Sequence, residues 1–296
     1  MDESIERVDA LPALPRRRAD GHKGDYGRVL IVGGSRGMVG AVALAANAAL
    51  RGGAGLTTFA APETIQLAAA TICPCATSVP LACERDGQLA REALGEFRSA
   101  AEAADVLAVG PGLSVGTRQQ ELVRAAIEVA KPLVLDADGL NNLARLDRWP
   151  EMRRGPVVLT PHPGEFSRLT RRSIAEIQAD RQGAAVAAVR QWLAVAPDRP
   201  LVLLLKGAGT VITDGRRVRI NETGNPGLAT GGSGDVLTGL AAALLAQGLD
   251  AFDSASLAAH VHGRAGDLAA ERLGQVSLIA TDLLEFLPAA IREACP

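Results

Sequence analysis

A glycine-rich run that ends in an acid is the part of this sequence best suited to chemistry. Residues 225–235 read NPGLATGGSGD and lead into the apolar segment 236–245, which predicts a helix. The groups able to do chemistry are three glycines and one acid: Gly231, Gly232, Gly234 and Asp235. Small residues let backbone N–H groups close around a phosphate at a helix start, where the peptide dipoles favour an anion. Asp235 would repel that phosphate unless it takes a proton from a hydroxyl that attacks phosphorus, so the run indicates phosphoryl transfer.

A simpler interpretation of this run stays open, in which the glycines form an ordinary loop and Asp235 is a first-turn helix residue favoured by the dipole. The run is not a Walker-type phosphate loop, because no Lys follows its glycines. Residues 33–37 look like a dinucleotide-binding turn, but the glycine spacing differs and no ribose-binding acid follows about twenty residues later. That disfavours a nicotinamide hydride-transfer enzyme.

Other polar and glycine residues cluster where apolar, strand-like segments end. The clusters are Gly33 with Gly34, Gly110 to Gly112, Asp136 with Asp138, His162 with Glu165, and Lys206 with Gly207. In open α/β sheets ligands bind beyond the carboxyl ends of the strands. We therefore expect these clusters to line one crevice.

Three of the clusters allow two interpretations each. Lys206, at the start of the turn 206–210, would meet a phosphate, or else be a solvated Lys on a hairpin. His162 would contact a substrate, or cap the following helix. Asp136 and Asp138 would hold magnesium through water, or hydrogen-bond neighbouring loops.

Strand-like and helical segments alternate through most of the chain. Strands are expected at 28–32, 56–60, 105–109, 132–135, 157–160 and 201–205, and helices at 41–50, 173–194, 236–247, 254–271 and 281–287. The segments 210–213 and 217–220 predict an antiparallel hairpin. The order predicts an α/β fold with a mainly parallel sheet and helices on both faces. We expect an extended lead-in over 1–20 and one domain over 21–296.

Composition and charge argue against nucleic acid and membranes as partners, and they bear on the location of the protein and the state of its cysteines. The chain has 296 residues and a net charge of −2, with dispersed charges that attract neither nucleic acid nor an anionic membrane. No apolar run could act as a signal sequence or membrane span, so we expect a cytoplasmic protein. The four cysteines, Cys73, Cys75, Cys83 and Cys295, lack the partners of a zinc site and are expected to be free thiols.

Taken together and in order, the motifs resemble one family, the ADP-dependent (S)-NAD(P)H-hydrate dehydratases of the ribokinase-like superfamily. The matching stretches are residues 22–27 (HKGDYG), 33–41 (GGSRGMVGA), 110–113 (GPGL), 136–141 (DADGLN), 160–165 (TPHPGE), 206–210 (KGAGT) and 225–235. They span about residues 20–265. The resemblance implies a three-layer α/β/α fold and the repair of nicotinamide cofactors damaged by hydration of the ring.

The resemblance also implies roles for particular residues. The hydrated cofactor would be contacted by Ala41, Gly112, His162 and Asp235, with Asp235 as the catalytic base. The nucleotide would be held by Lys206, Gly207, Ala208, Gly209, Thr210 and Gly234, and the glycine loop adds Gly231 and Gly232. ADP would be the co-substrate, with ATP also possible, and magnesium would accompany it through ligands that the sequence does not identify. A homotetramer is expected by family likeness.

The resemblance further implies that only the S epimer is a substrate. Family members often carry an N-terminal epimerase domain, and the residues before His22 are too few for one, so an epimerase on a separate chain is expected. Preference for NADH hydrate or NADPH hydrate stays open, with Arg36, Arg118 and Arg264 as candidates for a 2′-phosphate contact. Residues 73–86 match no motif of the family.

Two alternative functions remain. A small-molecule kinase of the same fold, acting on a hydroxymethylpyrimidine, a hydroxyethylthiazole or a sugar, would share the glycine loop and Asp235. Residues 160–165 and 206–210 favour the dehydratase over the kinase. A nucleotide sensor without turnover is disfavoured, because both the acid and its glycines are present.

Overall fold

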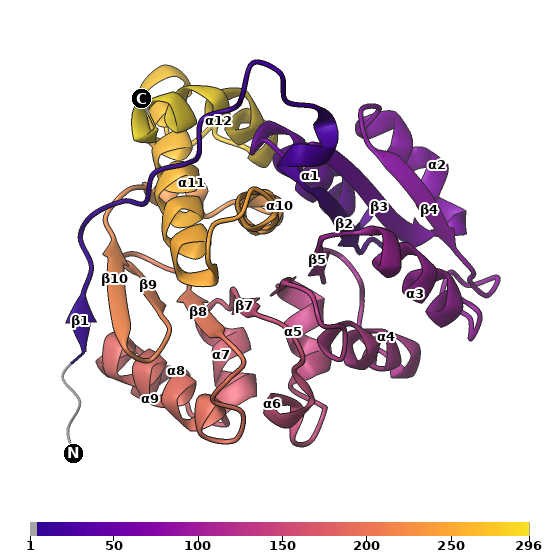
Figure 1. Cartoon of the computed structure of the whole chain (residues 1–296), viewed down its shortest axis with the longest axis horizontal. Coiled ribbons are helices and arrows are strands. Elements are labelled where there is room, and N and C mark those ends of the chain that lie inside the picture. The colour runs from indigo at the N-terminus through magenta and orange to yellow at the C-terminus, as the bar shows by residue number, and fades with distance from the viewer. Residues whose placement is uncertain (1–4, 296) are drawn as a thin grey trace.

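A single mixed sheet organises the chain (Figure 1), and the computed structural model describes residues 5–295. The sheet has ten strands in the order β1-β10-β9-β8-β7-β6-β5-β2-β3-β4. The strands are β1 (Glu6–Arg7), β2 (Arg28–Val32), β3 (Leu56–Pro62), β4 (Thr77–Leu81), β5 (Val106–Val109), β6 (Leu133–Leu135), β7 (Val157–Leu159), β8 (Leu201–Leu205), β9 (Thr210–Thr213) and β10 (Arg217–Asn221). The neighbours from β4 to β8 all pair in parallel, and β9 pairs antiparallel with both β8 and β10. The predicted parallel sheet and hairpin are thus confirmed.

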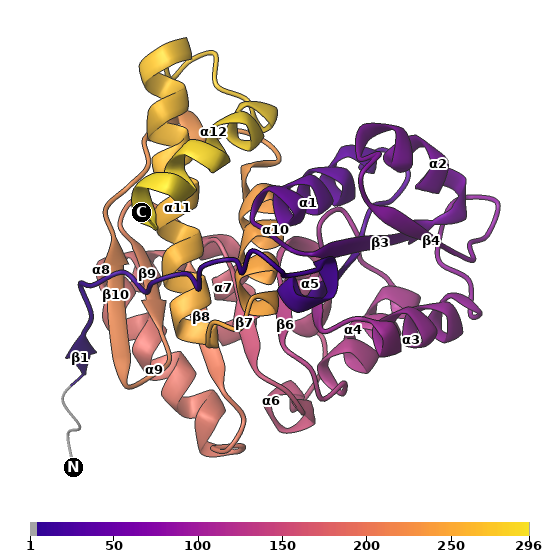
Figure 2. The same ribbon diagram turned by 45° about the horizontal axis from the view of Figure 1, so that its top comes forward.

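Helices cover both faces of the sheet (Figure 2), because the central strands are apolar on both sides. One face carries α1 (Val39–Arg51), α2 (Glu63–Ile72), α10 (Ser233–Ala246), α11 (Ala251–Leu273) and α12 (Ala280–Ala294). The other carries α3 (Ala93–Ala103), α4 (Thr117–Ile127), α5 (Ala137–Leu143), α6 (Trp149–Met152), α7 (Pro163–Thr170), α8 (Ile174–Ala179) and α9 (Arg181–Ala194). Alternate residues of one strand enter opposite cores: Val29 and Ile31 face one, Leu30 and Val32 the other.

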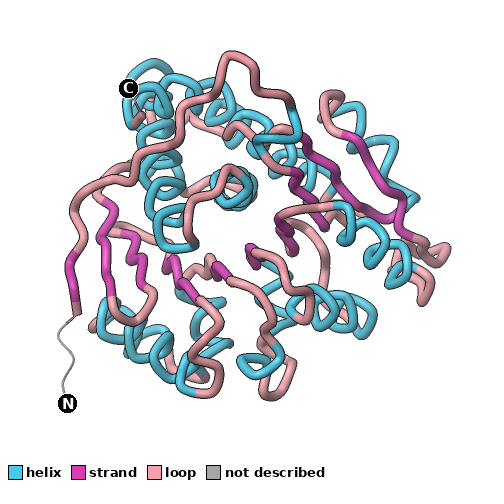
Figure 3. The backbone as a smooth tube through the Cα atoms, in the orientation of Figure 1, coloured by secondary structure: helices cyan, strands magenta, loops and turns pink. Residues whose placement is uncertain are grey.

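Helix α10, which follows the glycine run, is the most enclosed helix of the first face. It lies near the centre of the view in Figure 3, between α11 and α1. Its contact with α1 is so close that a Cβ added to Gly239 would lie 1.9 Å from the carbonyl oxygen of Ala45. Only glycine fits there without moving a backbone, so the residue type at 239 sets the depth at which α10 sits.

The structure differs from the predicted elements in several places. The helical region 173–194 is two helices, because Asp180 leaves helical geometry and its side chain accepts a hydrogen bond from the Gly183 N–H at the start of α9. Strand β4 and helices α2 to α7 were not predicted, since their apolar runs are short or mixed with charge. Within the lead-in, β1 pairs with β10, and the Arg219 guanidinium donates to the carbonyls of Asp9 and Ala10.

Candidate functional site

The start of α10 forms an uncapped helix N-terminus. Gly232 precedes it with φ +90°, a left-handed conformation that disfavours side chains, and among residues 5–295 no side chain caps the helix. A Cβ on Gly231 would meet nothing within 4 Å among these residues, so the loop borders open space. Free N–H groups and a helix dipole directed at open space are the features of an anion site.

Lys206, which is partly exposed, and Asp136, which is buried, form an ion pair behind this anion site. The Lys206 Nζ lies 2.6 Å from Asp136 Oδ1, and the Asp136 side chain is 2% exposed. A Cβ on Gly234 would lie 3.4 Å from that same Nζ, so the ammonium lies directly beside the first turn of α10. Burial lowers the pKa of Lys206, but Asp136 and Glu165 outweigh it and hold that pKa above its usual value. The ammonium is therefore a fixed positive charge, and the alternative of a solvated Lys206 is wrong.

Asp235 lies on the first turn of α10 in an environment suited to a base. Burial raises its pKa, Asp136 raises it further and Lys206 opposes the shift, which leaves the pKa at about 7. A carboxylate with such a pKa accepts a proton readily at neutral pH and can release it again. This is the property that the base of a hydroxyl attack requires.

His162 has a structural role in addition to any contact with a substrate. It caps α7: its Nδ1 accepts from the N–H of Gly164 at 3.0 Å, while the Glu165 carboxylate accepts from the N–H of His162 at 2.8 Å. The ring is half exposed; its Nδ1 is occupied as an acceptor, and its Nε2 lies 3.4 Å from Glu165 Oε1. The helix-cap interpretation is confirmed, and burial raises the pKa of Glu165.

Ala41 and Gly112, expected to contact one substrate, are in contact with each other. A Cβ on Gly112, whose φ is +64°, would lie 3.0 Å from the Ala41 Cβ. Asp138 holds the following loop, since its carboxylate accepts from the N–H of Ser114 at 2.9 Å. Asp138 also acts on the pKa of Asp235, in the upward direction. The Gly112 loop follows β5, the neighbouring strand β6 ends just before Asp136, and a Cβ on Gly234 would lie 3.6 Å from Asp136 Oδ2, so the loop and the start of α10 lie at the same edge of the sheet.

The turn 206–210 brings the expected nucleotide residues to the same edge of the sheet. Gly207 and Gly209 have φ values of +144° and +62°, and the Thr210 hydroxyl donates to the Gly207 carbonyl at 2.9 Å. Arg181 braces the turn from α9 by donating to the carbonyls of Leu205 and Lys206. The turn is exposed apart from its two ends, so its backbone is accessible to a ligand.

The two aspartates considered for magnesium have protein partners. Asp136 binds Lys206 and accepts from the Thr238 hydroxyl at 2.6 Å, and Asp138 accepts from Ser114 and Asn141. Among residues 5–295 no group of three or more His, Cys, Asp or Glu could hold a metal ion. The contacts that Asp136 and Asp138 make are therefore those of the hydrogen-bonding interpretation.

Sequence reasoning missed the residues that fix the glycine run from α11. The Asp267 carboxylate accepts from the N–H of Gly224 at 2.9 Å and from the Asn225 side-chain amide at 3.0 Å. His262 is buried with its Nε2 2.9 Å from the Ser233 carbonyl, and burial lowers the pKa of His262 to about 4. Neither Asp267 nor His262 belongs to a local sequence motif. Thr238 of α10, which donates to Asp136, could have been found from the sequence, because it lies one helical turn after Asp235.

The cysteines lie in different environments, and none of them is paired with another. All four cysteines are free, as predicted, and Cys73 is buried, which raises the pKa of its thiol. Residues 73–86, which match no motif of the family, include strand β4 and the beginning of a turn at 84–88. Within residues 5–295, no helix combines the length and apolar character needed to cross a bilayer.

The fold and the site together define a class of protein, the ribokinase-like α/β proteins. A ribokinase-like superfamily protein from Enterococcus faecalis superposes with a TM-score of 0.77 at 27% identity, over 95% of this chain and 92% of its own. A hydroxyethylthiazole kinase from Pyrococcus horikoshii shares the fold at a TM-score of 0.59 and 18% identity, over 91% of this chain and 92% of its own.

Within that class the chain belongs to the NAD(P)H-hydrate dehydratase family, whose model matches residues 29–289. It is 50% identical over 284 residues to a bifunctional NAD(P)H-hydrate repair enzyme of Moorella thermoacetica, covering 94% of this chain and 52% of that protein. The chain therefore spans about half the length of this curated relative. An ADP/ATP-dependent NAD(P)H-hydrate dehydratase of Bacillus subtilis, co-crystallised with ATP and Mg²⁺, has a TM-score of 0.79 at 32% identity, over 95% of both chains.

Proposed function

We propose that this protein dehydrates the S epimer of NAD(P)H hydrate with ADP as co-substrate, giving NAD(P)H, AMP and phosphate. The observation that carries the proposal is the position of Asp235, a carboxylate with a pKa of about 7 on the first turn of an uncapped helix, beside the Lys206 ammonium. Family membership and the likeness to the Bacillus subtilis dehydratase support the same substrate class.

In the first step Asp235 takes the proton of the ring hydroxyl, and the hydroxyl oxygen attacks the terminal phosphorus of ADP. The new bond joins that oxygen to phosphorus, and the bond from phosphorus to the bridging oxygen breaks, so AMP leaves with the electron pair. The N–H groups at the start of α10 and the Lys206 ammonium stabilise the negative charge that develops on the transferred group. Mg²⁺, when bound to the diphosphate, neutralises part of its charge.

In the second step the ring expels phosphate, which is a far better leaving group than hydroxide. The nitrogen lone pair forms the iminium as the carbon–oxygen bond breaks, and loss of a proton from the neighbouring ring carbon restores the dihydronicotinamide. Ala41, Gly112 and the half-exposed His162 ring hold the ring side of the substrate in this scheme. The turn 206–210 and the loop of Gly231, Gly232 and Gly234 hold the nucleotide.

The proposal extends to the nucleotide used, the cellular compartment, the oligomeric state and the source of the S epimer. ATP would replace ADP where the pocket admits a third phosphate, with the same attack on a terminal phosphorus. The protein would act in the cytoplasm as a homotetramer, and an epimerase would convert the R form of the hydrate into the S form used here.

Product analysis tests the reaction class. With the S hydrate and ADP, the proposal expects AMP, free phosphate and NAD(P)H in equal amounts. A stable phosphorylated product without free phosphate would instead establish the alternative, a small-molecule kinase. Nucleotide binding without any product would favour the sensor.

A further inference from the structure

The structure separates the three arginines that the sequence left as candidates for a 2′-phosphate contact. On α11, Arg264 lies 2.6 Å from Glu293 and 3.4 Å from Glu271. Arg118 makes two hydrogen bonds to Glu121, at 3.0 and 2.8 Å. Both guanidinium groups are thus already neutralised by carboxylates.

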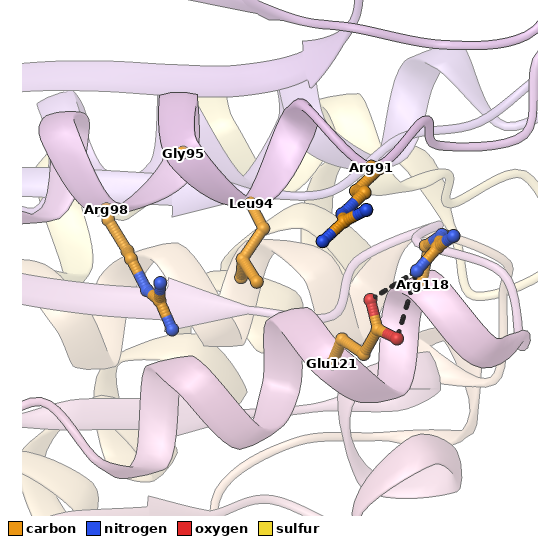
Figure 4. Close-up of a pocket in the computed structure, with 6 residues that line it drawn as sticks. All are labelled: Arg91, Leu94, Gly95, Arg98, Arg118 and Glu121. Carbon is orange, nitrogen blue, oxygen red and sulfur yellow. Dashed lines mark hydrogen bonds and ion pairs between the residues drawn. The ribbon is translucent and has the colours of Figure 1, made fainter.

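Figure 4 shows where the Arg118 side chain lies. It joins Arg91 and Arg98 around a hollow of about 530 Å³ between α3 and α4. Its dashed contacts run to Glu121, one turn further along its own helix. Neither Ala41 nor Gly112 lines this hollow.

Arg36 differs from both, because none of the ion pairs among residues 5–295 involves it. It lies on the loop between β2 and α1, which is held in place at two points: the Gly34 N–H donates to the Pro111 carbonyl at 2.7 Å, and the Met38 N–H donates to the Ser35 carbonyl at 2.9 Å. A Cβ on Gly112 would lie 3.0 Å from the Met38 Cβ. Arg36 is therefore an exposed cation without an ion pair, on a fixed loop at the border of the substrate side.

The turn 84–88 supports the stem of Arg36. The Glu84 N–H donates to the Gln88 carbonyl at 2.8 Å, and Gly87 has φ +88°. A Cβ built on Gly87 would lie 3.5 Å from the Arg36 Cβ and 3.8 Å from its Cδ, so the turn packs along the aliphatic part of the side chain. The Gln119 amide of α4 donates to Gln88 at 3.3 Å and fixes the turn from behind.

A small polar cavity lies beneath this contact. It measures about 50 Å³, and its polar lining includes Ser35, Arg36, Ser114 and Gln119 together with one acid, Asp86, whose carboxylate accepts from the N–H of Gln88 at 3.0 Å. The Ser35 and Ser114 hydroxyls lie 2.9 Å apart in its wall. Hydroxyl and amide donors beside a free guanidinium are the groups that bind a phosphate monoester.

We propose that Arg36 and the turn 84–88 form a subsite for the 2′-phosphate of hydrated NADPH, so that this protein prefers NADPH hydrate to NADH hydrate. The inference rests on the proposed function, since it identifies the distal end of the same substrate. Arginine suits this task because its planar fork binds phosphate oxygens in pairs, and a 2′-phosphate is commonly accommodated in this way in dinucleotide sites.

Steady-state kinetics on the S hydrates of NADPH and NADH test the subsite in the full chain. We expect Arg36→Ala to lower kcat/KM for NADPH hydrate about 10-fold or more through KM, because it removes a charge-assisted contact. Turnover of NADH hydrate stays within about twofold of the parent. Arg36→Lys recovers part of the loss, and the matched control Arg118→Ala changes neither substrate. Equal losses on both substrates would place Arg36 on the pyrophosphate and overturn the inference, as would no loss on either.

A binding measurement separates this inference from the proposed function. Titration with adenosine 2′-monophosphate, followed by calorimetry, needs no turnover. If the parent binds adenosine 2′-monophosphate and Arg36→Ala does not, the subsite is supported even when no hydrate is converted. A failure to convert either hydrate would contradict only the proposed function. No difference between parent and variant overturns the subsite even if hydrates are converted.

Discussion

The Lys206 ammonium lies 2.6 Å from the Asp136 carboxylate, and this pair joins the ends of strands β8 and β6 directly beside the first turn of α10. Asp136 is almost fully buried and also accepts the Thr238 hydroxyl from α10 itself. Through these two contacts, Asp136 holds the start of α10 against the edge of the sheet and holds the Lys206 ammonium beside the anion site. Its replacement should affect stability and catalysis in different ways.

Removal of one partner of this pair leaves the other charge buried. We expect Lys206→Met to lower the free energy of unfolding by about 3 kcal/mol, because the Asp136 carboxylate loses its counterion. The double variant Lys206→Met, Asp136→Asn should recover part of that loss but none of the activity. Urea unfolding of both single variants and the double variant measures the coupling. Strictly additive losses would show that the two groups do not stabilise each other.

Asp235→Asn tests the base. The amide keeps the shape but cannot take a proton, so kcat should fall about 100- to 10,000-fold while ADP still binds. Single-turnover kinetics and calorimetric titration with ADP measure the two effects separately. Asp198→Asn, at an exposed position, is the matched control and should leave both unchanged. A near-normal rate for Asp235→Asn would remove this residue from the mechanism.

The rate should depend on pH through the same group. With a pKa of about 7, Asp235 is mostly protonated below neutrality and mostly ionised above it. The base must be ionised to act, so kcat/KM should rise about tenfold per pH unit below pH 7 and level off above it. A profile measured from pH 5 to pH 9 checks this, and a rate that is flat across neutrality would contradict the assignment.

Stability should depend on the ionisation of Asp235 in the opposite sense. The pKa of Asp235 is higher in the folded state than in the unfolded state, so folding favours the neutral acid. The stability that Asp235 contributes is therefore fully present below pH 3.8 and is lost as the pH rises through about 7. Asp235→Asn removes the penalty of a buried carboxylate. Its Tm should exceed that of the parent at pH 8, and the difference should shrink towards pH 5. A constant difference across that range would rule out this electrostatic origin.

Asp267 should matter for the nucleotide although it lies outside the site. It binds Gly224 and Asn225 at the beginning of the glycine run, so Asp267→Ala frees two donors and loosens the loop. We expect a rise of about fivefold or more in the KM for ADP, on the scale of about 1 kcal/mol per lost hydrogen bond. Glu271→Ala on the same helix is the control and should have no such effect. An unchanged KM for ADP would mean that the loop holds its shape without Asp267.

The sheet was predictable because its central strands are short apolar runs that end in glycine or polar clusters. Residues such as Val29 and Leu30 are buried on opposite faces, so the whole run is apolar and stands out in the sequence. Strand β4 did not stand out, because it lies at the edge of the sheet and its Thr77 is exposed. The break at Asp180 depends on a side-chain contact that helical periodicity does not reveal.

The site was predictable in its chemistry and less so in its contacts. The glycine run and Asp235 can be identified from residue type and spacing alone. The strand-end clusters could be assigned to one site because the carboxyl ends of parallel strands meet at one edge of the sheet. The pairing of Lys206 with Asp136 joins residues far apart in the chain, and sequence alone left each with two interpretations. His262 and Asp267 lie in a long helix with no local motif, so only the three-dimensional arrangement shows that they fix the loop.

The dehydratase activity can be followed as the recovery of dihydronicotinamide absorbance after the protein is added to a mixture of hydrated NADH epimers with Mg²⁺ and ADP. We expect absorbance to return only when ADP or ATP is present, and to stop rising when the S epimer is consumed. No recovery with either nucleotide, in folded protein shown to bind ADP, would rule out the dehydratase and favour a kinase of the same fold.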